Sequence, residues 1–250
     1  WRRSRSSAPP VELPPDAAAA AVILTRWRLA LVASSAAEAE ATARATVLLA
    51  AAGTSMTAAV KAAADEGWNL LSDSSWVGYS DPARDVMEGY LIMGMEVAEQ
   101  VPVPPSHIFL QAGVGGLAAA CAVAARTCWG RDPVICVVEP DAAPALLASI
   151  NAGKAVAASG PASNMGRLDC KEPSHLALKY LAREANTFML VSDAEAVVAV
   201  TTLENTGIAS TPSGVAGFAG LQYAVANDID LKLDQNSRVL VYVSEGPEDD

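Results

Sequence analysis

A glycine-rich turn between an apolar run and an alanine-rich run is the feature that most restricts the fold. Residues 108–111 suit a buried strand, residues 112–116 contain the turn, and residues 117–128 continue at helical period. Residues 134–138 are a second short apolar run. A strand that breaks into glycines and resumes as a helix before another strand is typical of a parallel sheet. The sequence therefore predicts a strand–turn–helix–strand unit here.

Glycines at positions 113, 115 and 116 give this turn two interpretations. Without side chains, their main-chain N–H groups can approach a ligand closely, and the following helix adds the positive end of its dipole. Such a turn binds anions, most often phosphate. The other interpretation is a tight strand-to-helix connection with no ligand, because short glycine motifs occur often by chance. The spacing alone leaves both open.

The rest of the chain alternates between segments that suit a strand and segments that suit a helix. This alternation predicts a single α/β unit with a parallel sheet flanked by helices, in which the loops at the carboxyl ends of the strands carry the site. The long irregular loop at residues 159–174 is of a size more often functional than filler. We expect further helices at 36–45, 56–67, 86–100, 143–151, 175–186, 193–204 and 215–226, and further strands at 46–50, 69–72, 188–192 and 238–243. Ser192 or Asp193 is the expected cap of the helix at 193–204.

Charge and composition exclude several classes of function. The chain has 250 residues, 52% of them hydrophobic, and a net charge of −11 with only 17 basic residues. That balance argues against binding to nucleic acid or to an anionic membrane surface. Two histidines are too few for a multi-histidine metal site, and the four cysteines have no paired CxxC spacing. We expect no metal, and buried free thiols in a reducing compartment.

The amino-terminal region differs from the remainder. Residues 1–16 are rich in Arg, Ser and Pro and are expected to be disordered. Their composition resembles an organelle transit peptide, although a fragment end explains it equally well. Residues 17–32 are interrupted by two arginines, fall short of a membrane span and suit a strand and a helix. We therefore divide the chain into a non-homologous segment, 1–45, and an α/β domain, 46–250, located in the cytoplasm unless the start targets an organelle.

Seven segments, taken in order and at their spacings, resemble one family of enzymes. The segments are SDSSWVGY (72–79), MEGY (87–90), HIFLQAGVGGLA (107–118), VVEPDAA (137–143), NMGRLDCKEPS (164–174), SGVAGFAGL (213–221) and VYVSEG (241–246). Together they resemble diaminopropionate ammonia-lyase, a pyridoxal-phosphate (PLP) enzyme of the tryptophan synthase β-like group. The likeness runs from about residue 46 to residue 246.

The resemblance implies a fold, a cofactor and a reaction. Members of the group hold PLP between two α/β domains, and this chain would correspond to that fold with its amino-terminal portion incomplete. The family reaction is α,β-elimination from 2,3-diaminopropionate, which gives pyruvate and ammonia, with the cofactor acting as electron sink. The resemblance also implies an amino-acid substrate and a homodimer.

Site residues are carried over one position at a time. Gly113, Val114, Gly115, Gly116 and Leu117 match the loop that holds the PLP phosphate, in agreement with the anion interpretation. The resemblance places other residues at the site as well. Ser244 matches a hydroxyl hydrogen-bonded to the pyridine nitrogen, although a plain strand-end serine is the alternative.

Further matches are weaker, and each has a structural alternative. Asp73 matches a catalytic aspartate near the substrate, where a carboxylate pairs with an ammonium group or moves a proton; alone it suits a turn. Trp76 and Tyr79 would line the same loop unless they pack in the core. Met165, Asp169, Cys170 and Glu172 lie in the long loop, which resembles an active-site cover, and Glu139 suits a helix cap.

Two departures from the family pattern bear on activity. The family's Schiff-base lysine and its asparagine-containing loop lie in an amino-terminal segment that has no counterpart here, and none of the five lysines is a candidate. The glutamate expected before Ser213 is also missing, since Thr211 and Pro212 stand there. We therefore expect this chain not to catalyse the family reaction unaided. Alternatives are a catalytically dead module that binds PLP or another phosphorylated ligand, and a nucleotide-binding α/β protein, although no GxGxxG pattern supports the latter.

Overall fold

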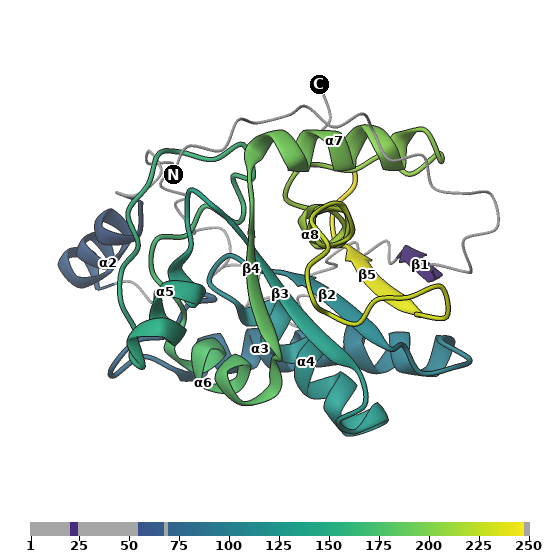
Figure 1. The fold of residues 1–250 in the computed structure, drawn as a ribbon. Helices are drawn as coiled ribbons and strands as arrows, with labels where there is room; N and C mark the ends of the chain where they lie inside the picture. Colours follow the sequence, from purple (N-terminus) through teal and green to yellow (C-terminus); the bar gives the residue numbers. More distant parts are fainter. Residues whose placement is uncertain (1–20, 25–54, 68–69, 248–250) are drawn as a thin grey trace.

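The computed structural model describes residues 21–24, 55–67 and 70–247 of the chain. These residues form a parallel sheet with helices on both faces, as the alternation of elements predicts (Figure 1). The strands are β1 (Ala21–Leu24), β2 (His107–Gln111), β3 (Val134–Pro140), β4 (Thr187–Val191) and β5 (Val239–Val243). The helices are α2 (Ser55–Glu66), α3 (Asp81–Gln100), α4 (Gly116–Trp129), α5 (Ala145–Ala152), α6 (His175–Glu184), α7 (Asp193–Glu204) and α8 (Ala216–Ala226).

The sheet has the strand order β1–β5–β2–β3–β4, and every neighbouring pair is parallel. β2 therefore lies at the centre, with β5 on one side and β3 on the other. Since all strands run the same way, their carboxyl ends meet at one edge of the sheet. The glycine turn after β2 and Ser244 after β5 both lie at that edge.

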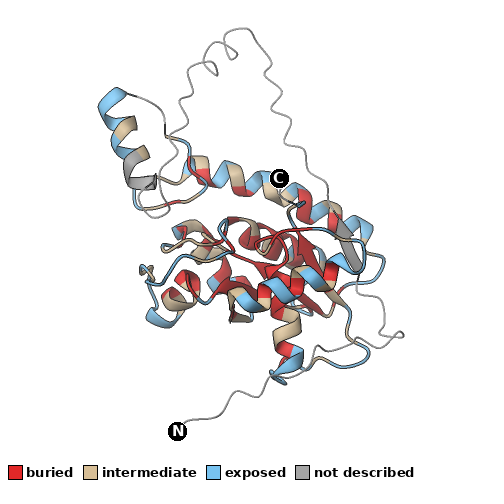
Figure 2. Ribbon diagram, turned by 90° about the horizontal axis from the view of Figure 1, so that it is seen from above, coloured by how far each residue is buried: buried red, intermediate tan, exposed pale blue. Residues whose placement is uncertain are grey.

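Alternating side chains divide the core into two layers. Ile108, Leu110 and Tyr242 pack in the cluster that includes α3, α4 and α6, whereas Phe109 and Val241 pack in the cluster that includes α7 and α8. This is the two-residue period of a strand that is buried on both faces. Figure 2 shows the buried strands at the centre of the molecule, covered by helices whose outer faces are exposed.

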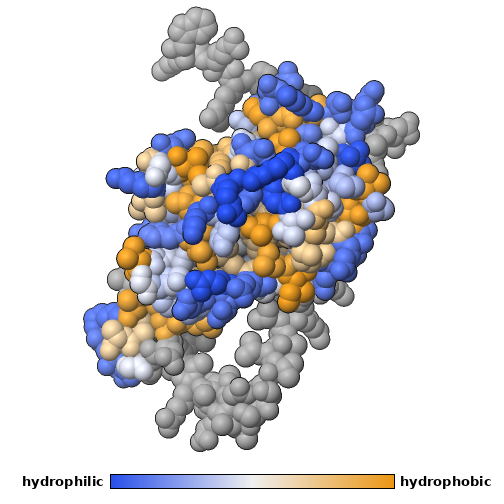
Figure 3. Space-filling model, turned by 90° about the horizontal axis from the view of Figure 1, so that it is seen from below, coloured by the Kyte–Doolittle hydropathy of each residue, from blue (hydrophilic) through white to orange (hydrophobic). Residues whose placement is uncertain are grey.

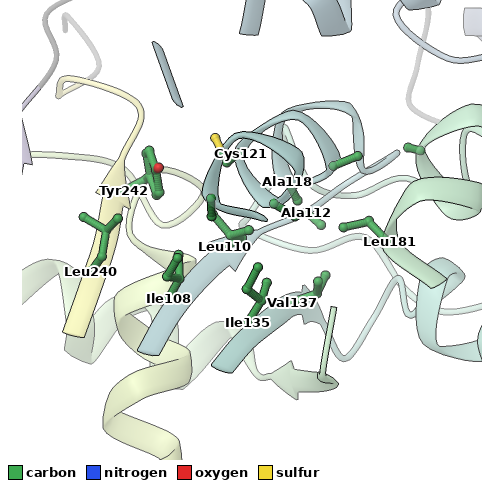
Figure 4. Close-up of a cluster of buried hydrophobic side chains, with 14 of the residues drawn as sticks. Ile108, Leu110, Ala112, Ala118, Cys121, Ile135, Val137, Leu181, Leu240 and Tyr242 are labelled. Atoms are coloured by element: carbon green, nitrogen blue, oxygen red, sulfur yellow. The ribbon is translucent and has the colours of Figure 1, made fainter. Parts of the chain in front are cut away.

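Small residues allow α4 to pack tightly. Eight of its 14 residues are buried, and seven of those are glycine or alanine. On the facing helix, a Cβ at Gly94 would lie 2.7 Å from Ala124 Cβ, so α3 and α4 approach more closely than larger side chains would permit. Figure 4 shows Ile108, Leu110 and Tyr242 of the sheet directed at this helix. The alanine-rich composition is thus explained by packing.

Helix ends follow the chemistry of their caps. Ser192 caps α7 as predicted: its hydroxyl accepts a hydrogen bond from the Glu195 N–H, and the Glu195 carboxylate accepts from the Ser192 N–H to complete a capping box. Glu139 is fully buried and accepts from the main-chain N–H groups of Leu146 and Leu147, at 2.7 and 2.8 Å. The predicted role of Glu139 as a helix cap is therefore confirmed, at α5.

Two local predictions are wrong. Residues 70–72 form no strand, because this short run has no neighbouring strand to pair with. α3 begins at Asp81, five residues before the predicted start, since Pro82 occupies the first turn of the helix, where its missing N–H costs nothing. The strand within residues 17–32 is found as β1, while the predicted elements at 36–45 and 46–50 and the boundary at 45/46 lie outside the described residues.

The cysteines and the surface agree only in part with expectation. All four cysteines are free, but only Cys121 and Cys136 are buried as expected, whereas Cys170 is partly exposed and Cys128 is exposed. No cluster of potential metal ligands occurs among the described residues, and none of their helices has the length and apolar character to cross a bilayer. Seen from below, hydrophobic and hydrophilic residues are interspersed (Figure 3), so this view singles out no docking face.

Glu139 generates a prediction about stability and pH. Burial raises its pKa to about 7, against the opposing effect of the two amide hydrogen bonds. A carboxyl whose pKa is higher in the folded state stabilises the fold below the unfolded pKa of 4.5, and that contribution is lost as the pH rises through 7. As the pH rises from 4.5 to 7, the unfolding free energy of the wild type should therefore fall relative to that of Glu139→Gln. The expected fall is about 1.4 kcal/mol for each pH unit between the unfolded and folded pKa values of Glu139.

Urea unfolding between pH 4.5 and 8 measures this difference. Glu204→Gln on the exposed face of α7 is the matched control for the removal of one glutamate. A constant difference between wild type and Glu139→Gln across this range would contradict the argument.

Candidate functional site

The glycine loop, residues 113–117, connects the carboxyl end of β2 to α4. Gly115 precedes the helix with φ +98°, a backbone conformation that favours glycine. Within the described part of the chain, the main-chain N–H groups of Gly113, Gly115, Gly116 and Leu117 donate to no acceptor. They cluster at the amino end of a 14-residue helix, where the dipole adds partial positive charge. The loop is therefore suited to an anion.

The segment of residues 167–174 packs against the glycine loop and fixes its shape. The Ser174 N–H donates to the Val114 carbonyl at 3.0 Å, and the Val114 N–H donates to the Cys170 thiol. A Cβ at Gly113 would lie 3.0 Å from Cys170 Sγ, so a side chain at this position would displace the segment. The absence of a side chain at Gly113 is therefore required by packing as well as by any ligand.

Ser244 follows β5 and is held by a residue that the sequence analysis missed. Gln111, the last residue of β2, donates from Nε2 to Ser244 Oγ at 2.9 Å and to the Tyr242 carbonyl at 3.1 Å. In the described residues, the Ser244 hydroxyl donates to no acceptor, and its side chain is exposed. The hydroxyl is thus oriented, with its proton free for a ligand. A polar residue that ends an apolar strand was the available signal for Gln111.

Asp73 lies on the loop between α2 and α3, with its side chain exposed. Burial raises the pKa of Tyr90 on α3, and the negative charge of Asp73 raises it further. The same two causes, in the same order, raise the pKa of Cys170 to about 11. Two residues after Asp73, the Ser75 N–H donates to Ser174 Oγ, and the Ser174 N–H donates to the Val114 carbonyl. The loop that carries Asp73 is therefore joined to the glycine loop through Ser174.

Trp76 and Tyr79 organise the loop that carries Asp73. Their rings stack with centroids 4.2 Å apart and planes 9° apart, and their backbones exchange two hydrogen bonds of 3.0 Å. The Tyr79 hydroxyl also donates to the Leu70 carbonyl and accepts from the Ser72 N–H. Both rings are half-buried, so they pack on each other within the loop rather than in the main core.

The long loop at residues 159–174 is anchored at several points. Met165 is fully buried in the core layer beneath α7 and α8, and Asp169 pairs with Lys171. The Lys171 ammonium also donates to two main-chain carbonyls. Glu172 is exposed and borders an open groove of about 470 Å³ beside the Asp73 loop. Of the four residues predicted in this loop, only Cys170 contacts the glycine loop directly.

The five lysines lie in other environments. Lys61 is exposed and pairs with Asp65, and Lys171 is occupied as described. The remaining three, Lys154, Lys179 and Lys232, are exposed. Among the described residues, no lysine makes a hydrogen bond to the glycine loop or to Ser244.

A carboxylate contacts the segment in which the expected glutamate is missing. The Thr211 hydroxyl donates to the Glu245 carboxylate and accepts from the Gly214 N–H. The Glu245 carboxylate also pairs with Arg167 at 3.1 Å. Glu245 immediately follows Ser244. The negative charge near Thr211 is therefore supplied by the end of β5.

Comparison with known proteins agrees with this geometry. The sequence matches the family described as pyridoxal-phosphate dependent enzyme over residues 21–245. It is 30% identical over 203 residues to diaminopropionate ammonia-lyase of Escherichia coli K12, and the match covers 75% of this chain and 51% of that protein. The chain thus spans about half the length of this relative.

Solved structures give the same result. The Escherichia coli diaminopropionate ammonia-lyase in complex with an aminoacrylate–PLP azomethine intermediate superposes with a TM-score of 0.68 at 27% identity, covering 77% of this chain and 53% of that one. The processed form of threonine deaminase isoform 2 from Solanum lycopersicum has a TM-score of 0.69 at 19% identity, covering 85% and 59%, and supports the fold alone. The predicted fold class, family resemblance and cofactor are confirmed.

The packing of the glycine loop generates a prediction about stability. An alanine at position 115 would adopt an unfavourable positive φ, and its Cβ would lie 3.2 Å from three side-chain carbons of α5 and α6. Gly153→Ala is the matched control, since φ is also positive there, at +65°, but nothing lies within 4 Å. Gly153→Ala should cost about 1 kcal/mol of unfolding free energy, and Gly115→Ala about 2–3 kcal/mol because overpacking adds to the strain.

Urea unfolding measures both variants. Equal losses for Gly115→Ala and Gly153→Ala would show that the neighbours of Gly115 yield freely and that packing does not fix the loop.

Proposed function

We propose that this chain, which belongs to the pyridoxal-phosphate-dependent enzyme family, is the cofactor-binding portion of an ammonia-lyase that acts on 2,3-diaminopropionate. The observation that carries the proposal is the set of main-chain N–H groups at Gly113, Gly115, Gly116 and Leu117 that have no acceptor among the described residues, at the same edge of the sheet as the oriented hydroxyl of Ser244. The relative at 30% identity bears the name of that activity. The reaction converts the diamino acid to pyruvate and ammonia.

The residues suit the two ends of pyridoxal phosphate. Gly113–Leu117 would hold the phosphate through main-chain N–H groups, and Val114 takes part through its carbonyl, which fixes the loop. Ser244 directly follows β5, the strand that pairs with β2, and adjacent strands are about 4.8 Å apart. One elongated ligand can therefore contact both features, with its phosphate at the glycine loop and its pyridine nitrogen at the serine hydroxyl.

When bound, pyridoxal phosphate supplies an electron sink that stabilises negative charge at the substrate Cα. The protein's own contribution is to orient the reactants and to hold protons. The Ser244 hydroxyl, whose oxygen accepts from Gln111, is left to donate its proton to the ring nitrogen. The Asp73 carboxylate pairs with a substrate ammonium group or accepts a proton at the substrate, as suits an exposed carboxylate on a loop that is joined to the glycine loop through Ser174.

None of the described lysines is a candidate for the Schiff base that attaches the cofactor in this family. Lys171 is bound to Asp169 and to two carbonyls, and the other four lysines are exposed. This observation favours a second candidate function, in which the chain is a non-catalytic module that binds PLP or another phosphorylated ligand. Under either function, this chain is expected not to turn over the substrate unaided. A homodimer and a cytoplasmic location remain predictions.

Charge at the start of α4 tests the proposed phosphate site. A Cβ at Gly116 would make only an ordinary contact of 3.6 Å with Met87, so Gly116→Ala should be tolerated. Gly116→Asp adds a negative charge that suits a helix amino terminus but repels a phosphate. We expect Gly116→Asp to lower the affinity for PLP at least about ten-fold relative to Gly116→Ala.

Calorimetric titration with PLP, and with pyridoxal as the ligand without phosphate, measures this effect. The affinity for pyridoxal should change little between the two variants. Equal PLP affinities for Gly116→Ala and Gly116→Asp, or no PLP binding by the wild type, would remove the glycine loop from the site.

Borohydride reduction tests whether a lysine of this chain attaches the cofactor. The protein is mixed with an equimolar amount of PLP, reduced, and digested for mass spectrometry. We expect no single lysine to be labelled stoichiometrically, because the described lysines are either paired or exposed. Stoichiometric labelling of one lysine would contradict this expectation and would favour the catalytic function over the binding module.

A further inference from the structure

Two buried serines form a polar contact between distant segments. Ser75 belongs to the Asp73 loop and Ser174 precedes α6, and their exposed fractions are 2% and 0%. Their hydroxyl oxygens lie 2.8 Å apart, and the Ser75 N–H donates to Ser174 Oγ at 3.1 Å. Burial of two hydroxyls is costly unless both are hydrogen-bonded, so this pair specifies one arrangement of the two segments.

Ser75 also caps the helix that Ser174 precedes. The Leu176 N–H donates to Ser75 Oγ at 2.8 Å, and the His175 N–H donates to the Ser75 carbonyl at 2.9 Å. The first N–H groups of α6 are therefore satisfied by a residue about 100 positions earlier in the sequence. Loss of the Ser75 hydroxyl would leave the Leu176 N–H buried without an acceptor.

Ser174 transmits this contact to the glycine loop. Its N–H donates to the Val114 carbonyl. The described chain has no cis peptide bond, so the N–H of Gly115, in the same peptide group, points opposite to the Val114 carbonyl. The hydrogen bond from Ser174 therefore directs the Gly115 N–H away from α6 and leaves it without an acceptor.

The same contact fixes the loop that carries Asp73. Around Ser75 this loop is mostly open to water, since Asp73, Val77 and Gly78 are exposed. Ser75 is buried and lies two residues from Asp73. The position of the Asp73 backbone relative to the glycine loop thus depends on the contact between Ser75 and Ser174.

We propose that Ser75 and Ser174 are positioning residues that hold the Asp73 loop and the amide groups of the glycine loop in a fixed relation. In the terms of the proposed function, on which this inference rests, the pair sets the distance between the group that meets the substrate and the group that meets the cofactor phosphate. Neither serine contacts a ligand itself. The two hydroxyls act as one unit because each depends on the other.

Alanine variants test this coupling. Ser75→Ala and Ser174→Ala should each lower the affinity for PLP about ten-fold, and the double variant should lose little more than either single one, because the pair acts as a unit. Ser149→Ala is the matched control. Ser149 is also buried, and its hydroxyl hydrogen-bonds to the Ala145 carbonyl and the Val156 N–H, neither of which belongs to the glycine loop or to the Asp73 loop. The Ser149→Ala variant should have lower thermal stability than the wild type and the same affinity for PLP.

Amide hydrogen exchange in the ligand-free protein separates this inference from the proposed function. In Ser75→Ala, the Ser174 N–H should exchange about ten-fold faster than in Ser149→Ala, since its contact with Val114 is weakened. Unchanged exchange, or PLP affinities equal to that of Ser149→Ala, would overturn the inference. If the wild type fails to bind PLP while the exchange rate rises as expected, the proposed function fails and the positioning role stands.

Discussion

The candidate site depends on the orientation of one peptide group, the one that joins Val114 to Gly115. Its carbonyl accepts a hydrogen bond from Ser174, and its N–H is left free at the amino end of α4. A free N–H in this position is useful only if the backbone cannot rotate to satisfy it elsewhere. Positive φ at Gly115, the close approach of α5 and α6, which leaves too little room for a Cβ there, and the bond to Ser174 together oppose that rotation.

The sheet explains why this peptide group has useful neighbours. Parallel strands place all their carboxyl ends at one edge, so β2 and β5 deliver the glycine loop and Ser244 to adjacent positions although they are more than 120 residues apart. Gln111 then joins the two strands through its side chain, whose orientation is fixed because Nε2 meets the Tyr242 and Gly214 carbonyls. The site is thus assembled at the ends of the central strand and one of its neighbours, in the buried centre of the sheet.

Local patterns in the sequence were sufficient to predict elements but not contacts. The glycine turn, the alternation of strands and helices and the cap at Ser192 depend on neighbouring residues, and all were found. Residues 70–72, which form no strand, and the early start of α3 show the limit of such patterns. A strand needs a partner strand, and α3 begins at an aspartate and a proline that resemble a loop. Gln111 and Ser75 were missed because their partners lie 133 and 99 residues away. No periodicity encodes such pairs.

The charge of the chain gives the amide groups their importance. With a net charge of −11, the long-range field of this protein opposes the approach of a phosphate. The two basic residues in the segment beside the site, Arg167 and Lys171, are already paired with Glu245 and Asp169. An anion at the glycine loop must therefore be held by hydrogen bonds and by the helix dipole, both of which act only over the first turn. Since such short-range interactions fail when the donors move by a fraction of an ångström, a site built in this way requires rigid supports, and the buried hydroxyls of Ser75 and Ser174 meet that requirement.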